Sequence, residues 1–188
     1  SVCIVTKNNQ DTIERCLQSI FSWVDEIVVV DSDSTDGTVE ICEDYGAEIH
    51  QLEFNGFADI KNAAIDRADN QWVFIIDSDE WVPKTLKNEI IEEYKKGSFE
   101  RVDAFGIKKK NKMFGRWMHV DHPRRPLLAK KDSIHFQGKY IHERLSVKDS
   151  SNSKIKNLTE KINHLAYSNV SGKVKKIDQY ASLQALEY

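Results

Sequence analysis

Short apolar runs alternate with helix-like segments near the start of the chain, and this alternation restricts the fold more than any other feature. Runs of strand length occur at residues 1–6, 26–30, 48–54 and 72–76. Apolar residues recur at helical spacing at residues 11–20, 38–45, 58–68 and 83–97. Because the strands are mostly apolar throughout, we expect them to be buried on both faces. The sequence therefore predicts an α/β fold with a mainly parallel central sheet flanked by helices.

The chain has 188 residues, of which 40% are hydrophobic, and this suits a single domain with a sizeable core. After residue 100 the pattern changes to short strands at 102–109, 126–129, 133–136 and 144–147, a polar loop at 148–157 and an amphipathic helix at 174–186. No apolar run approaches the roughly 18 residues that cross a membrane. The chain begins inside a strand pattern and stops inside a helix pattern, so we expect the native chain to extend beyond both ends.

Charge is unevenly distributed, although the formal net charge is only −3. Residues 1–105 hold 9 Lys and Arg against 23 Asp and Glu, whereas residues 106–144 hold 11 against 3. An acidic first part suits a bound divalent cation, and a basic second part suits an anionic glycan, a lipid phosphate or a membrane surface. Solvated surface charge is the alternative explanation for both.

The three cysteines, Cys3, Cys16 and Cys42, are odd in number and form no C-x-x-C motif. The sequence therefore predicts neither a zinc site nor a disulfide framework. Each cysteine lies on an apolar face, as buried free thiols do. This usage fits a reducing cytoplasm.

The segment Asp77-Ser78-Asp79-Glu80 directly follows an apolar strand, at the end of the sheet where ligands bind in such folds. Packed carboxylates repel one another and are tolerated when they share a cation. Oxygen ligands suit Mg²⁺ or Mn²⁺, which keep coordination places for water and substrate phosphates. A solvated acidic turn is the alternative, but the buried strand in front of this D-x-D motif favours a metal site.

A second polar segment, residues 31–37, follows the strand at 26–30. The carboxylate of Asp31 can accept the imide N–H of a uracil, and the Ser/Thr/Asp cluster can cap the next helix. The same letters also match the D-x-D-x-T phrase of haloacid-dehalogenase-type phosphatases, with Asp31 as nucleophile and Asp33 as acid/base. That phrase normally opens its fold, whereas a strand and a helix precede it here.

The order of these motifs resembles the family-2 glycosyltransferases of the GT-A fold. A strand followed by Thr-x-Asn leads to V-V-D-S-x-S-x-D-G-T, then a helix, then a strand that ends in D-x-D. Residues 55–80, which include Lys61-Asn62, and the later Gly138-x-x-x-His142-Glu143-Arg144 resemble the bacterial branch that builds lipopolysaccharide core and related surface glycans. The likeness covers most of the chain and is most specific over residues 1–85.

The resemblance implies that residues 1–100 bind a nucleotide sugar and residues 101–188 bind the acceptor. The implied donor-binding residues are Thr6, Asn8, Asp31 and Asp33 around the nucleoside, Lys61 near the nucleotide, and Asp77 at the ribose or the metal. Asp79 would bind Mn²⁺ or Mg²⁺ directly. His164 would match the late histidine that completes the metal or diphosphate site, although a lone histidine in such a sequence is often structural.

Glu143 is the candidate general base, with Asp121 and Glu80 as rivals and an ion pair with Arg144 as the structural alternative. The candidate acceptor-binding or phosphate-binding residues are Trp117, Arg124, Arg125, His142 and Arg144. Sugars stack on aromatic rings and arginines bind phosphate bidentately. Trp117 as core filler, and His142 as a group that orients the base or satisfies a core contact, are the alternatives.

The sequence departs from the family pattern in two places. Lys61-Asn62-Ala63-Ala64 stands where many members have R-N-x-G, and lysine does not reproduce the contacts of arginine. The Q-x-x-R-W motif that accompanies processive synthases is absent from the sequence, which favours transfer of a single sugar.

The resemblance thus implies an inverting, non-processive glycosyltransferase that moves a sugar from a nucleotide-diphosphate sugar to a hydroxyl of a glycan or glycolipid. UDP is the nucleotide that the resemblance implies, and the basic second part of the chain suggests that the acceptor is anionic. The family implies bacterial cell-surface polysaccharide or lipopolysaccharide biosynthesis, a cytoplasmic location at the inner face of the membrane, and peripheral membrane association. We expect no nucleic-acid partner, because the chain is acidic and has no RNA-binding signature. The alternatives are the phosphatase, a nucleotidyltransferase, whose usual Gly-rich opening loop residues 1–11 lack, and a non-catalytic nucleotide-sugar-binding module.

Overall fold

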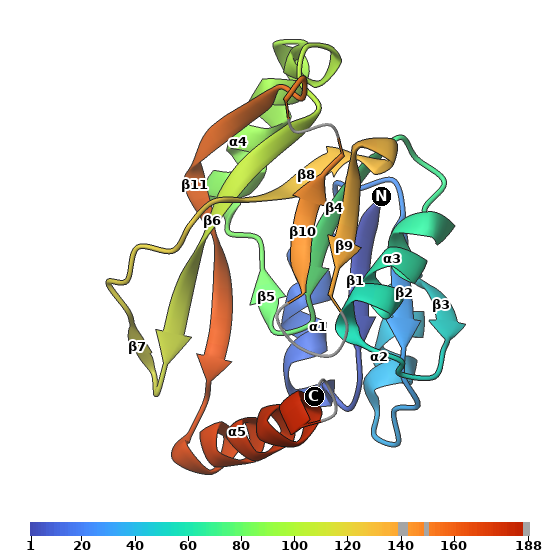
Figure 1. Cartoon of the computed structure of the whole chain (residues 1–188), viewed down its shortest axis with the longest axis vertical. Helices are drawn as coiled ribbons and strands as arrows, with labels where there is room; N and C mark the ends of the chain where they lie inside the picture. Colours follow the sequence, from blue (N-terminus) through green and yellow to red (C-terminus); the bar gives the residue numbers. More distant parts are fainter. Residues whose placement is uncertain (139–142, 149–150, 186–188) are drawn as a thin grey trace.

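The computed structural model describes residues 1–138, 143–148 and 151–185, and one large sheet runs through these residues (Figure 1). Its strands follow the order β3-β2-β1-β4-β8-β6-β11-β5, and β7 pairs with β6. A second sheet consists of β9 and β10. The α/β class with a central sheet flanked by helices is confirmed.

The first half of the chain forms a parallel sheet with connecting helices. Its elements are β1 (Val2–Thr6), α1 (Gln10–Gln18), β2 (Ile27–Asp31), α2 (Thr38–Asp44), β3 (Glu48–Gln51), α3 (Phe57–Arg67), β4 (Trp72–Asp77) and α4 (Lys84–Lys95). The register pairs Thr6 with Asp31 and Val5 with Asp77. The polar residues that end β1, β2 and β4 therefore share one edge of the sheet, as the sequence predicts.

The second half adds strands of mixed direction. Its elements are β5 (Glu80–Trp81), β6 (Ala104–Met113), β7 (Arg116–Trp117), β8 (Arg125–Lys130), β9 (Ile134–Gln137), β10 (Arg144–Val147), β11 (Ile155–Tyr167) and α5 (Val170–Ala185), with short 3₁₀ turns at Ser98–Glu100 and Lys131–Ser133. β8 runs antiparallel to β4 and β6, whereas β6 and β11 are parallel. The sheet is thus parallel on one side and mixed on the other.

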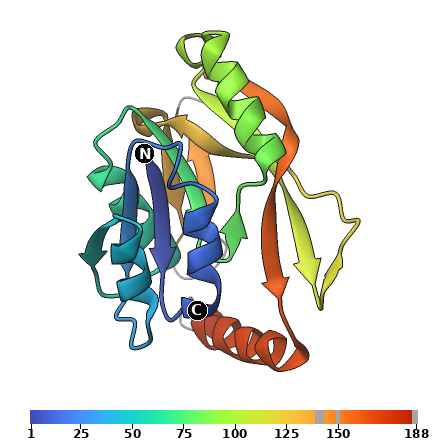
Figure 2. The same cartoon turned by 180° about the vertical axis from the view of Figure 1, so that it is seen from behind.

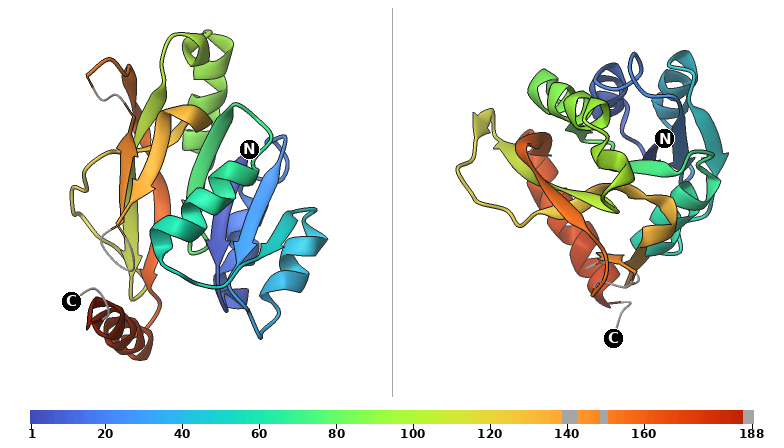
Figure 3. Two further views of the ribbon diagram at one scale, coloured as in Figure 1. Left: turned by 45° about the vertical axis from the view of Figure 1, so that its right-hand side comes forward. Right: turned by 90° about the horizontal axis from the view of Figure 1, so that it is seen from above.

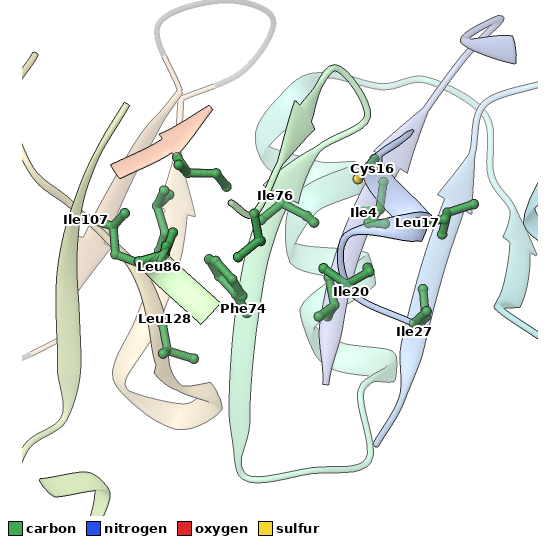
Figure 4. Packing of buried hydrophobic residues seen from close by; sticks show 14 of the residues in the cluster. Ile4, Cys16, Leu17, Ile20, Ile27, Phe74, Ile76, Leu86, Ile107 and Leu128 are labelled. Atoms are coloured by element: carbon green, nitrogen blue, oxygen red, sulfur yellow. The ribbon is translucent and has the colours of Figure 1, made fainter. Parts of the chain in front are cut away.

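Helices and the small sheet cover the two faces of the large sheet. α1, α2 and α4 lie on one face (Figure 2), where Leu17, Phe74 and Leu86 belong to one buried cluster (Figure 4). α3 and the β9–β10 pair lie on the other face (Figure 3), where Ile60 and Phe136 belong to a second cluster. All three cysteines are free and buried, as predicted.

Several element bounds and some burial details differ from the sequence prediction, and two of these differences are informative. The predicted polar loop at 148–157 overlaps β11, which begins at Ile155 and extends for 13 residues. Only Leu158 and Ile162 of this strand are fully buried, and polar residues stand between them. The strand therefore lacks the apolar run that would mark it in the sequence. Helical spacing places Tyr94 with Leu86 and Ile90, yet Tyr94 is 69% exposed, and its ring lies 5.6 Å from that of Phe99.

α5 lies across the end of the molecule at which β1 and β4 finish (Figure 1). Tyr180 and Leu183 of this helix line the same cavity as Thr6 of β1 and Asp77 of β4. Among the described residues, no helix has the length and apolarity needed to cross a membrane.

Candidate functional site

A cavity of about 400 Å³ opens at the carboxyl ends of β1 and β4. Six of the residues singled out in the sequence line it, namely Thr6, Lys61, Asp77, Asp79, Glu143 and His164. They come from β1, α3, β4, the turn after β4, the segment before β10, and β11. The fold therefore brings together residues from both halves of the chain around one hollow.

Lys61 of α3 lies in the wall of this cavity and is only 5% exposed. Its Nζ lies 2.9 Å from Oδ1 of Asp77 and 3.1 Å from Oε1 of Glu143. Burial opposes the charge of Lys61, but Asp77 and Glu143 outweigh it, so the pKa of Lys61 is raised. Lys61 is therefore a cation that links the end of β4 to Glu143.

Lys109 of β6 is a second cation at this site, which the sequence analysis did not identify. Its Nζ lies 3.1 Å from Oδ2 of Asp77 and also contacts Glu80. Burial of Asp77 would raise its pKa, but Lys61 and Lys109 together hold the pKa of Asp77 well below its usual range. In the sequence Lys109 lies in the run Lys108-Lys109-Lys110, which gives no sign that this lysine alone reaches the site.

The two rivals to Glu143 as a base occupy other positions. Glu80 is 1% exposed, accepts the backbone N–H of Asp77 at 3.0 Å and pairs with Lys109. The side chain of Asp121 is 76% exposed and pairs with Lys108. Of these three carboxylates, only Glu143 is among the residues that line the cavity.

Asp79 and His164 lie next to each other in the lining of the cavity, with 3.4 Å between Oδ2 of Asp79 and Nε2 of His164. The backbone N–H of Leu165 donates to the carbonyl of Asp79 at 2.9 Å, which ties the turn after β4 to β11. Within the described part of the chain, no group of three or more His, Cys, Asp or Glu residues is arranged to hold a metal. Mg²⁺ commonly takes one or two carboxylates and completes its shell with water and substrate phosphates. The Asp79–His164 pair therefore fits a cation that the substrate helps to hold.

The loops after β1 and β2 are joined by side-chain hydrogen bonds. Asn8 has a φ of 52°, its N–H donates to Oγ of Ser34 at 2.8 Å, and its Oδ1 accepts the N–H of Thr35 at 2.8 Å. Thr6 is 5% exposed and its hydroxyl donates to Oδ1 of Asn9 at 3.0 Å. These contacts fix the loops that border the cavity.

Asp31 is fully buried, and Asp33 beside it is exposed with a φ of 58°. The two carboxylate oxygens of Asp31 accept the N–H of Ser34 at 2.9 Å and its hydroxyl at 2.5 Å. Asp31 thus holds the turn that precedes α2. A nucleophile must be reached by its substrate, so the burial of Asp31 argues against the phosphatase alternative.

The predicted acceptor-binding residues lie apart from this cavity. Trp117 is 36% exposed, and its ring lies 5.9 Å from that of Trp81. Arg124 and Arg144 are exposed and Arg125 is half-buried. None of these four is among the described residues that line the cavity. His142 lies outside the described residues.

The fold and the site define an α/β protein whose carboxylates and lysines gather where parallel strands end, as in proteins that bind phosphorylated ligands at that edge. Residues 1–151 match the model of the family described as glycosyl transferase family 2. The chain belongs to glycosyl transferase family 2. This membership argues against the nucleotidyltransferase alternative.

Relatives and structural neighbours agree with this assignment. An uncharacterized glycosyltransferase of Rickettsia felis is 38% identical over 108 residues, which cover 57% of this chain and 38% of the relative. The prophage-derived glycosyltransferase SunS of Bacillus subtilis is 33% identical over 104 residues, which cover 54% of this chain and 25% of that protein. The chain thus spans well under half of these relatives.

Staphylococcus aureus TarS 1–349 in complex with UDP-GlcNAc superposes with a TM-score of 0.63 at 20% identity, covering 89% of this chain and 58% of that one. The same protein in complex with UDP gives a TM-score of 0.62 at 23% identity, covering 88% and 60%. At this level of identity the likeness concerns the fold, and it confirms the GT-A fold expected from the sequence.

Proposed function

We propose that the chain is the catalytic domain of an inverting, non-processive glycosyltransferase that moves one sugar from a UDP-sugar to a hydroxyl group. The observation that carries the proposal is the meeting of Lys61, Asp77, Asp79, His164 and Glu143 around one cavity. A metal-bound diphosphate at Asp79 and His164 would then lie beside Glu143, a carboxylate that can act as a base. TarS, which shares the fold, has been solved with UDP-GlcNAc, and this supports a UDP-sugar as donor.

The donor side of the site depends on fixed charges. Lys61 and Lys109 keep Asp77 ionised and hold it in place at the end of β4. Asp79 and His164 would hold Mn²⁺ or Mg²⁺, which when bound neutralises charge on the leaving nucleotide diphosphate. The nucleoside would lie over Thr6 and Asn8, against the loops that these residues tie together.

Glu143 acts on the acceptor. Its carboxylate lines the cavity and is oriented by Lys61 at 3.1 Å. As the acceptor hydroxyl attacks the anomeric carbon opposite the leaving group, its proton passes to Glu143, and the configuration at that carbon inverts. Such proton transfer contributes about 10²–10⁴-fold to a rate.

We assign the acceptor to anionic glycans or glycolipids of bacterial surface polysaccharide or lipopolysaccharide biosynthesis. The protein would bind this acceptor at the inner face of the membrane. The hairpin of β6 and β7 supports this, because Phe114, Trp117 and Met118 are 44%, 36% and 38% exposed. Nζ of Lys110 lies 4.6 Å from the ring centre of Trp117. Exposed aromatic residues beside lysines suit a sugar with anionic groups and the surface of an anionic membrane.

The deciding experiment measures binding and slow hydrolysis of UDP-, GDP-, ADP- and CMP-sugars with Mn²⁺, with Mg²⁺ and with EDTA. We expect metal-dependent binding of a UDP-sugar, and we expect Asp79→Asn to weaken it. The matched control is Asp132→Asn, which changes an exposed aspartate remote from the cavity. A folded protein that binds none of these donors contradicts the proposal and favours a non-catalytic module.

A further inference from the structure

The side chain of Asn111 lies between two histidines. Asn111 of β6 is directly opposite His164 of β11 in the strand register. Its Oδ1 lies 2.9 Å from Nδ1 of His164, and its Nδ2 lies 2.9 Å from Nε2 of His122. One carboxamide thus contacts both rings with its two different ends.

These contacts define the tautomer of His164. A carboxamide oxygen can only accept a hydrogen bond, so with Oδ1 of Asn111 facing the ring, this contact favours the tautomer in which Nδ1 of His164 carries the proton. In the neutral ring Nε2 then holds the lone pair, and it is this atom that lies 3.4 Å from Oδ2 of Asp79. Metal-binding histidines commonly donate their other ring N–H in this way to an oxygen acceptor, which fixes the ring and its tautomer.

His122 contacts the other end of the carboxamide of Asn111. The NH₂ group faces Nε2 of His122 and the oxygen faces Nδ1 of His164, an arrangement in which Nε2 of His122 accepts a hydrogen bond. The backbone carbonyl of Asn111 also accepts the N–H of Met118 at 2.9 Å. The segment after β7, which carries Met118 and His122, is therefore attached to the same residue that orients His164.

We propose that Asn111 is a positioning residue that holds His164 in the Nδ1–H tautomer, with the Nε2 lone pair directed at the metal site beside Asp79. This inference rests on the proposed function, because it assigns His164 as a ligand. His122 contacts the other end of the Asn111 side chain, so Asn111 connects the segment after β7 to the metal site.

The first test reads the tautomer directly in the metal-free protein. Long-range ¹⁵N–¹H correlation spectra at about pH 8 distinguish the two tautomers of a neutral imidazole at His164. We expect the Nδ1–H form in the wild type and in Asn111→Asp, which keeps an oxygen acceptor. We expect a mixture of tautomers in Asn111→Ala. An Nε2–H form in the wild type would overturn the inference, and this measurement does not depend on any variant.

The second test measures Mn²⁺ affinity in the presence of UDP by titration calorimetry. We expect Asn111→Ala to bind Mn²⁺ about 10–100-fold more weakly, and Asn111→Asp to restore affinity to within a few fold. The control is Asn157→Ala, which changes an asparagine of β11 at the opposite end of the same strand pair. Unchanged affinity in Asn111→Ala would overturn this inference alone, whereas a wild type that binds no Mn²⁺ with UDP would overturn the proposed function as well.

Discussion

Lys61 and Glu143, 82 positions apart in the sequence, form an ion pair with 3.1 Å between Nζ and Oε1. The same Nζ lies 2.9 Å from Oδ1 of Asp77. One buried cation therefore joins the carboxylate at the end of β4 to the candidate base, which also lines the cavity. Because Lys61 serves both groups, changes at Lys61 and at Glu143 should have different consequences.

Replacing Glu143 by Gln should reduce the rate of sugar transfer by about 10²–10⁴-fold, because the amide cannot take the acceptor proton. Binding of the donor should be retained, since Asp77, Asp79 and His164 are untouched. Steady-state transfer rates and calorimetric donor binding measure the two effects separately. The control is Glu40→Gln, an exposed glutamate of α2. Turnover like that of the wild type in Glu143→Gln would remove Glu143 from the role of base.

Replacing Lys61 by Met should lower the free energy of unfolding by about 3 kcal/mol, because it leaves carboxylates without their buried cation. We expect the lower end of the range for a broken buried pair, since Lys109 still neutralises Asp77. Urea unfolding measures the loss. In the double variant with Glu143→Gln the two losses should not add, because the residues share one interaction. Strict additivity would mean that the ion pair contributes nothing to stability.

The first half of the fold could be predicted from the sequence because β1, β2 and β4 are apolar throughout and end in polar residues. The position of Asp77 and Asp79 could be predicted for the same reason, since a carboxylate at the end of a buried strand, or just after it, must lie at the edge of the sheet. Glu143 and His164 were identified only through the family resemblance. No periodicity in the sequence connects them to residues so far away.

Lys109 and Asn111 could not be predicted, because their roles depend on strand pairing. Both lie in the polar second part of β6, where residues 108–112 read Lys-Lys-Lys-Asn-Lys without an apolar residue. Asn111 meets His164 only because β6 and β11 pair in one register, and the sequence pattern predicts no strand around His164. Contacts between the side chains of two paired polar strands can be inferred only when the strand register is known.

Replacing Asp31 by Asn should lower the free energy of unfolding by about 2 kcal/mol. The buried carboxylate accepts two hydrogen bonds from Ser34, and hydrogen bonds to charged groups contribute about 1.5–3 kcal/mol. Asp33→Asn is the control, because Asp33 is exposed and asparagine tolerates its positive φ. Chemical denaturation of the two variants compares them. Equal stability of both would show that the turn before α2 does not depend on Asp31.

The stability of the protein at low pH should depend on Glu93 of α4, which is 7% exposed. Its Oε2 accepts hydrogen bonds from Nζ of Lys156 on β11 and, at 2.6 Å, from the hydroxyl of Ser98. These hydrogen bonds, that from Lys156 foremost, lower the pKa of Glu93 below its ordinary value. A carboxyl group with a lowered folded-state pKa stabilises the protein above its unfolded pKa, and the contribution is lost as the pH falls through the folded pKa.

Wild type should therefore be more stable than Glu93→Gln at pH 7, by about 1–2 kcal/mol, and the difference should disappear as the pH falls well below about 4. Unfolding free energies measured in urea from neutral to acidic pH test this. The neighbouring Glu92 provides a matched control, because its side chain is 66% exposed and pairs with Lys96 at the surface. Glu92→Gln should leave the pH profile nearly unchanged, since exposed pairs contribute little. A constant difference between wild type and Glu93→Gln at every pH would show that the ionised carboxylate is not what joins α4 to β11.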